Sequence, residues 1–86
     1  MTYNECLEEL EKATGRKFSM DIIFGEKYVL TKIDGFVEKI FGIPHNINKF
    51  NELKIFEGFE CFEEEEQEQM VKVVNKLIAT GYMIRF

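Results

Sequence analysis

The sequence predicts an α+β fold, a small two-layer sandwich in which a mainly antiparallel sheet of three to five strands packs against an N-terminal and a C-terminal helix. Three observations predict this fold. Apolar residues recur at helical spacing near both ends of the chain, they alternate in the middle, and glycines stand singly where one pattern gives way to the next. A chain of 86 residues is long enough for one domain and too short for two, so residues 1–86 are expected to form a single globular domain.

The first helix is predicted over residues 3–14. Thr2 and Glu5 have the spacing of a capping box, in which each side chain binds the backbone amide of the other residue. Gly15 can adopt the left-handed conformation that commonly ends a helix. The residues between these signals form one apolar stripe at helical spacing: Tyr3, Cys6, Leu7, Leu10 and Ala13.

Residues 17–33 are predicted to form a β-hairpin. Apolar residues alternate along 18–24, as expected for a strand that is buried on one face, and a second strand-like run follows. Between the two runs lies Gly25-Glu26, a pair with glycine first that suits a type II′ turn.

Residues 34–41 fit two alternatives. Asp34-Gly35 suits a second tight turn that leads into a strand. The segment also suits a helix that Asp34 would cap and Gly42 would end. The apolar residues at helical spacing are Ile33, Phe36, Val37, Ile40 and Phe41. We favour a short helix here, keep the strand as the alternative, and expect a loop at 43–49.

Residues 53–62 are predicted to form a strand in which Gly58 marks a bulge or a close approach of another backbone. A long helix is expected between Phe62 and Gly81, followed by a short terminal strand at 82–86. The expected core combines residues from all these elements: Leu10, Phe24, Val29, Ile33, Ile55, Phe59, Val74 and Leu77.

The charge of the chain is unevenly placed. Sixteen acidic and 11 basic residues give a formal net charge of −5. Residues 57–68, the acidic segment, hold seven glutamates and no basic residue, which leaves 9 acidic and 11 basic groups in the other 74 residues. A near-neutral body with one strongly acidic segment disfavours a protein that wraps DNA.

Two interpretations of the acidic segment remain open. Glutamates in the first turns of a helix are stabilised by the helix dipole, and Glu68 has the spacing of an ion pair with Lys72. One or two carboxylates would satisfy the dipole, however, and the others repel one another. This surplus predicts a surface that binds a basic partner protein, such as the nucleic-acid groove of an enzyme. The residues expected to form it are Glu57, Glu60, Glu63, Glu64, Glu65 and Glu68.

Catalytic and cofactor chemistry finds little support. The chain has one histidine, one serine and no nucleophile-elbow motif. Cys61 and His45 are the best candidates for a nucleophile and its base, and we interpret them as a buried thiol and a surface imidazole. The chain offers too few soft ligands for zinc, no calcium loop and no glycine-rich phosphate loop. We therefore expect a protein that is not an enzyme and has no metal or cofactor.

The compartment is predicted from the N-terminus and the hydropathy. Residues 1–14 hold four acidic residues and one lysine, which is the opposite of the basic start of a signal peptide. No stretch approaches 18 apolar residues, so no membrane contact is expected. These observations predict a cytoplasmic protein in which Cys6 and Cys61 are reduced and buried.

The leading hypothesis is a non-catalytic protein-binding domain that presents the acidic segment to a basic partner, in its sharper form as an inhibitor of a nucleic-acid enzyme. In size and composition the chain resembles small products of phages and mobile elements, among them anti-CRISPR and anti-restriction proteins, and no motif assigns it to a family.

Two alternative functions stay open. Basic residues over 12–54 would suit a nucleic-acid-binding or regulatory module, although their scatter disfavours direct nucleic-acid binding. An oligomeric structural protein would follow if Phe41, Phe56 and Phe62 formed an exposed patch that pairs copies of the chain.

Overall fold

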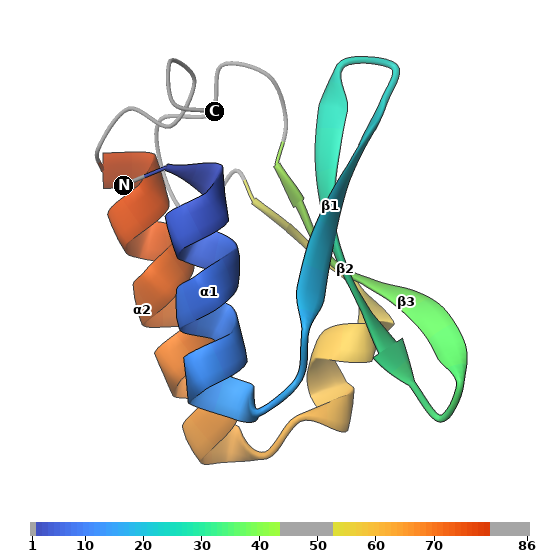
Figure 1. Cartoon of the computed structure of the whole chain (residues 1–86), viewed down its shortest axis with the longest axis vertical. Coiled ribbons are helices and arrows are strands. Elements are labelled where there is room, and N and C mark those ends of the chain that lie inside the picture. Colours follow the sequence, from blue (N-terminus) through green and yellow to red (C-terminus); the bar gives the residue numbers. More distant parts are fainter. Residues whose placement is uncertain (1, 44–52, 80–86) are drawn as a thin grey trace.

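The computed structural model describes residues 2–43 and 53–79, and it confirms the α+β prediction. Four strands form one antiparallel sheet in the order β1-β2-β3-β4, and two helices lie side by side over one face of it (Figure 1). In chain order the elements are α1 (Tyr3–Thr14), β1 (Phe18–Ile23), β2 (Glu26–Ile33), β3 (Phe36–Ile43), β4 (Lys54–Ile55), the 3₁₀ helix η2 (Glu57–Cys61) and α2 (Glu64–Ala79). None of the helices in the described part of the chain is long and apolar enough to cross a membrane.

Helix α1 forms as predicted, because both of its ends are encoded locally. The Glu5 amide donates to Thr2 Oγ1 over 3.1 Å, and the Thr2 amide donates to Glu5 Oε1 over 2.8 Å, which completes the capping box. At the other end Gly15 is left-handed, with φ of 73°, and its amide donates to the Glu11 carbonyl.

The first hairpin is confirmed, but its turn was predicted one residue too late. Ile23 pairs with Glu26, and the two central residues are Phe24 and Gly25, with φ of 52° and 81°. Two left-handed residues define a type I′ turn rather than type II′. Phe24 therefore stands in the turn instead of ending the strand. Its side chain is fully exposed, so its prediction as a core residue was wrong.

The segment after this hairpin is strand β3, so the favoured helix over 34–41 was wrong and the alternative was right. Asp34 and Gly35 form a second type I′ turn, with φ of 53° and 84°. A bulge explains why the pattern looked helical. Val29 pairs with Phe41 but Leu30 pairs with Lys39, which leaves Ile40 as an extra residue. Ile40 and Phe41 are both buried although they are adjacent, whereas adjacent residues of an ordinary strand point to opposite faces of the sheet.

The predicted strand over 53–62 exists only at Lys54–Ile55, after which the chain turns into η2. Gly58 makes the close approach that its position suggested. A Cβ there would lie 2.7 Å from Ile40 Cδ1 and 2.9 Å from the Lys39 carbonyl oxygen. This contact places η2 against β3, beside the short strand β4 (Figure 1). Ile55 is half exposed, so its assignment to the core was also wrong.

The core lies between the sheet and the two helices. Five of the predicted core residues are buried there, Leu10, Val29, Ile33, Val74 and Leu77, and Phe59 packs against them partly buried. Phe41 and Phe62 are buried as well and Phe56 is half-buried, so these three residues do not form the exposed patch on which the oligomeric alternative depended. The large apolar side chains that are exposed are different ones: Ile22, Ile23, Phe24, Phe36, Val37 and Ile55.

The two cysteines differ. Cys6 is buried as predicted, and this burial raises the pKa of its thiol to about 12. Cys61 is exposed, so the prediction of a buried thiol was wrong for it. The loop predicted at 43–49 was wrong at Ile43, which is the buried last residue of β3 because it continues the pairing with β2. The rest of that loop, with His45, and the predicted strand at 82–86 lie outside the described residues.

Candidate functional site

The acidic segment follows a three-residue pattern that shapes η2. Phenylalanines stand at 56, 59 and 62, and glutamates stand at 57, 60 and 63. A 3₁₀ helix has three residues per turn, so such a pattern gives it one aromatic face and one acidic face. The structure follows this division. The ring of Phe59 lies 5.4 Å from that of Phe41, the ring of Phe62 lies 6.0 Å from that of Phe18, and the glutamates are exposed. This signal was present in the sequence and would have predicted η2.

The start of α2 uses only part of the acidic segment. The Glu66 carboxylate accepts a hydrogen bond from the Glu63 amide over 3.1 Å, as the second half of a capping box does. The Gln67 side chain donates to the carbonyls of Phe59 and Phe62, each over 3.1 Å, and so ties the helix to η2. Glu66 and Gln67 are half-buried. Their role is to begin the helix and join it to the preceding element.

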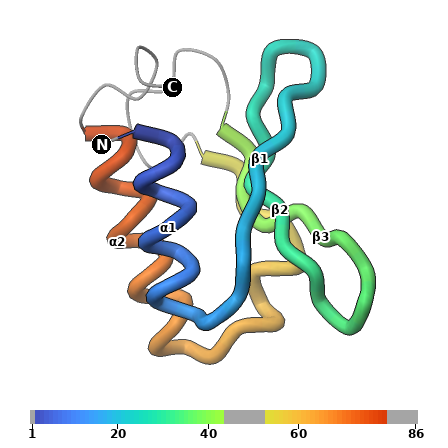
Figure 2. Tube along the Cα trace, viewed as in Figure 1, coloured from blue at the N-terminus to red at the C-terminus, as the bar shows by residue number. Residues whose placement is uncertain are grey.

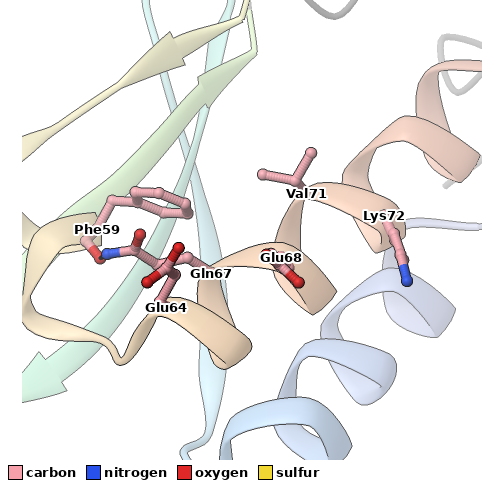
Figure 3. A pocket seen from close by; sticks show the side chains of 6 residues that line it. All are labelled: Phe59, Glu64, Gln67, Glu68, Val71 and Lys72. Carbon is pink, nitrogen blue, oxygen red and sulfur yellow. Dashed lines mark hydrogen bonds between the residues drawn. The ribbon is translucent and has the colours of Figure 1, made fainter.

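The other six glutamates of the segment are exposed, and these are the six that the sequence predicted as a binding surface: Glu57, Glu60, Glu63, Glu64, Glu65 and Glu68. Within residues 2–43 and 53–79, none of them forms an ion pair. The predicted pair between Glu68 and Lys72 is not formed, although both side chains lie along the same groove (Figure 3). Among the residues that the structure describes, six carboxylates therefore reach the surface without an ion-pair partner.

An open groove of about 450 Å³ runs between η2 and the first turns of α2. Phe59 and Val71 supply its apolar lining, and Glu64 and Glu68 supply its carboxylates (Figure 3). Gln67 and Lys72 complete the lining. The groove combines apolar area with negative charge, which a solvated helix start does not require.

One further carboxylate joins this surface from a distant part of the sequence. Glu38, on β3, lines a second open groove of about 540 Å³ together with Glu57, Glu60 and the exposed Cys61. Gly58 makes this possible, because the absence of its side chain lets η2 approach β3 closely. Sequence reasoning missed Glu38, and only the interpretation of Gly58 as a close approach pointed toward it. We call the six exposed glutamates and Glu38 the acidic surface.

A second polar cluster lies on the sheet face opposite the helices. The Tyr28 hydroxyl donates to Glu26 over 2.7 Å, and Lys54 Nζ lies 3.0 Å from the same carboxylate. These hydrogen bonds, first that of Tyr28, lower the pKa of Glu26, and the bond to Glu26 raises the pKa of Tyr28. Lys39 Nζ lies 4.4 Å from the Tyr28 ring centre and 5.7 Å from that of Phe56. Two lysines of the basic 12–54 stretch are thus gathered here, each already engaged.

No family model, curated protein or solved structure matches the chain. Among the residues that the structure describes, no group of three or more His, Cys, Asp or Glu side chains is arranged to hold a metal ion. The acidic surface is therefore interpreted from its own chemistry. Exposed carboxylates beside an apolar groove, with no ion pair to any other described residue, can attract and orient a cationic macromolecule.

Proposed function

We propose that this chain is a non-catalytic protein-binding domain that docks its acidic surface on a basic surface of a partner protein. In the sharper form of the proposal, the basic surface is the nucleic-acid-binding site of an enzyme, and the chain inhibits that enzyme by occupying it, as an inhibitor encoded by a phage or mobile element would. The observation that supports the proposal most is that six glutamates of one segment are exposed and form no ion pair within the described residues.

Electrostatics explains why such a surface favours binding. Glu66 already accepts a hydrogen bond from the Glu63 amide at the start of α2, and within the described residues neither Glu64 nor Glu65 makes a capping hydrogen bond. Like charges one turn apart on a helix destabilise it, by roughly 0.2–0.5 kcal/mol per pair. A cationic partner would remove this repulsion, and its approach would be accelerated by long-range attraction.

The groove beside these carboxylates narrows the kind of partner. Phe59 and Val71 offer apolar area between η2 and α2, with Glu64 and Glu68 beside it. A basic segment that also carries apolar side chains would bury this area while its lysines or arginines meet the carboxylates. A simple cation would gain only the attraction to the carboxylates and would bury no apolar area.

The test measures binding of a fluorescent peptide in which arginines and leucines each recur at helical spacing. Anisotropy titrations at about 50 mM and 500 mM salt compare the natural chain with the triple variant Glu64→Gln, Glu65→Gln, Glu68→Gln. We expect the variant to bind at least about tenfold more weakly at low salt and the salt dependence to shrink.

A matched control removes three negative charges elsewhere. Glu8→Gln, Glu11→Gln and Asp34→Asn change exposed carboxylates outside the acidic surface, and we expect less than about a threefold loss of affinity. Equal losses in the two triple variants would contradict a defined surface. Displacement of labelled DNA from a basic nucleic-acid-binding protein tests the sharper form separately, because a chain that binds that protein without displacing the DNA is not a competitor.

One observation favours a second candidate, a nucleic-acid-binding or regulatory module. Lys39 lies over the rings of Tyr28 and Phe56 on the sheet face opposite the helices, and aromatic rings with lysines are typical of surfaces that bind single strands. A gel-shift titration with single- and double-stranded probes decides between the candidates. Binding that is lost in Lys39→Gln and kept in the acidic triple variant would favour this second function.

A further inference from the structure

Strand β1 forms an open edge of the sheet. It is the outermost strand, and within the described residues no strand pairs with its outer side. The opposite edge is different, because β4 pairs with β3 and η2 packs beside it. Two of the large exposed apolar side chains, Ile22 and Ile23, lie on this open strand, and Phe24 follows them in the turn. An exposed edge with apolar side chains is a template for pairing with another chain.

The register of the first hairpin tells which backbone groups face outward. Ile23 and Glu26 flank a two-residue turn, and residues in that position form a hydrogen-bonded pair. Bonding alternates along the strand, so the amides and carbonyls of Phe18, Met20 and Ile22 face away from β2. The Ile22 amide donates to the side chain of the adjacent Asp21 over 3.0 Å. The Asp21 carboxylate thus accepts from an outward-facing amide that could instead donate to a neighbouring strand.

We propose that β1 pairs antiparallel with β1 of a second copy of this chain, around a two-fold axis at Met20. This register places Met20 opposite Met20 of the second copy, and it places each Ile22 opposite a Phe18. Asp21 then lies opposite Ser19 of the second copy, with Lys17 of that copy diagonally adjacent. A register centred one residue later would oppose two Asp21 carboxylates and is disfavoured. The four described strands of each copy then join into one eight-stranded sheet, with the described helices of both copies on the same face.

The second copy also fits the surroundings of this edge. An open groove of about 380 Å³ lies between α1 and β1, with Tyr3, Leu7, Met20 and Ile22 in its lining. In the proposed pair two such grooves face each other across the axis, so their apolar linings would shield one another from water. The exposed Asp21 and the net charge of −5 make an anionic lipid surface a poorer occupant. Because the apolar and charged side chains of β1 match those of a second β1, a second copy of the chain is the favoured occupant of this edge.

Sedimentation velocity over a concentration series tests the proposal. We expect reversible association in the micromolar range, from the chain mass of 10.2 kDa to twice that mass. Ile22→Lys should weaken association at least about tenfold, since each two-fold contact contains Ile22 twice. Val37→Lys is the matched control, because Val37 is also an exposed β-branched residue, at 61% against 52% for Ile22, but lies on β3. It should change association less than about threefold. A chain that stays monomeric near 1 mM, or equal effects of the two variants, would overturn the proposal.

A second measurement tests the register independently of the stability of Ile22→Lys. Cys61 is exposed, so both cysteine variants are made with Cys61→Ser, while the buried Cys6 is kept. Met20→Cys should form a disulfide-linked dimer under mild oxidation, because opposed residues in a hydrogen-bonded antiparallel pair have Cα atoms about 5.5 Å apart, within the range of a disulfide. Val37→Cys should associate as the natural chain does but form no disulfide-linked dimer. A dimer that fails to cross-link at Met20→Cys, or cross-links equally at Val37→Cys, contradicts this pairing.

Discussion

The turn between β1 and β2 and the turn between β2 and β3 have the same backbone conformation but different residues at the first central position. Phe24 has φ of 52° and Asp34 has φ of 53°, and each is followed by a left-handed glycine. Asp is among the residues that tolerate this conformation, whereas a bulky aromatic rarely adopts it. Figure 2 shows the two turns at opposite ends of the sheet. The second turn is optimised for the fold, and the first carries an exposed aromatic that the fold does not need.

The largest loss of stability is expected at a glycine outside the turns. Gly58→Ala should destabilise the protein by about 2 kcal/mol, the largest effect predicted here, because the new methyl group would overlap Ile40 Cδ1 and the Lys39 carbonyl oxygen. Urea unfolding followed by circular dichroism measures this loss. A change below about 0.5 kcal/mol would mean that η2 does not pack on β3 as described.

Substitution of the turn glycines should destabilise the protein for a different reason. Gly25 and Gly35 have φ of 81° and 84°, and a Cβ on either would meet no atom within 4 Å. Gly25→Ala and Gly35→Ala should therefore each cost about 1 kcal/mol through backbone strain alone. The same unfolding assay measures both variants. Because the two backbones match, unequal losses would show that the turns differ in more than their first residue.

Exchanging the first turn residues should move stability in opposite directions. Phe24→Asn replaces an exposed ring with a residue that favours the left-handed conformation, so we expect a gain of about 0.5–1 kcal/mol. Asp34→Phe should lose a similar amount. Both are read as shifts of the urea midpoint at low protein concentration, where association through β1 is minor. A loss of stability in Phe24→Asn would mean that the ring makes a contact that stabilises the single chain.

The same two turns show what the sequence could and could not predict. Helix α1 was predictable because Thr2, Glu5 and Gly15 encode its ends within a few residues. The strand after Asp34-Gly35 was obscured by the bulge at Ile40, since the extra residue places two adjacent side chains in the core and imitates helical spacing. The choice between helix and strand depends on the pairing with β2, and no local pattern in the sequence predicts that pairing.

Some features of the candidate site were likewise predictable from the sequence and others were not. Exposure of the six glutamates followed from their surplus over what the helix dipole needs, but the capping role of Glu66 depends on where the helix begins, which propensity leaves open by one turn. Glu38 was beyond reach, because it joins the surface through the packing of η2 on β3. Local chemistry was predictable, and contacts between distant segments were not.

The smallest predicted effect concerns the environment of the two turns. Next to the first turn, Glu26 accepts a hydrogen bond from Tyr28 and pairs with Lys54, and its pKa is lowered from a usual value of 4.5. A lowered folded-state pKa contributes stability that is present above about pH 4.5 and is lost as the pH falls through the lower, folded value. Unfolding measured at pH 7 and at about pH 3 should therefore show a smaller acid-induced loss in Glu26→Gln than in the natural chain.

Asp34→Asn is the matched control for this last comparison. It removes a carboxylate beside the second turn, where no residue in the described part of the chain is hydrogen-bonded to or paired with it. If the network around Glu26 is what makes the first turn sensitive to acid, Asp34→Asn should keep the acid-induced loss of the natural chain. Equal behaviour of the two variants would instead assign the pH dependence to overall charge, because each of them removes one negative charge from a chain of net charge −5.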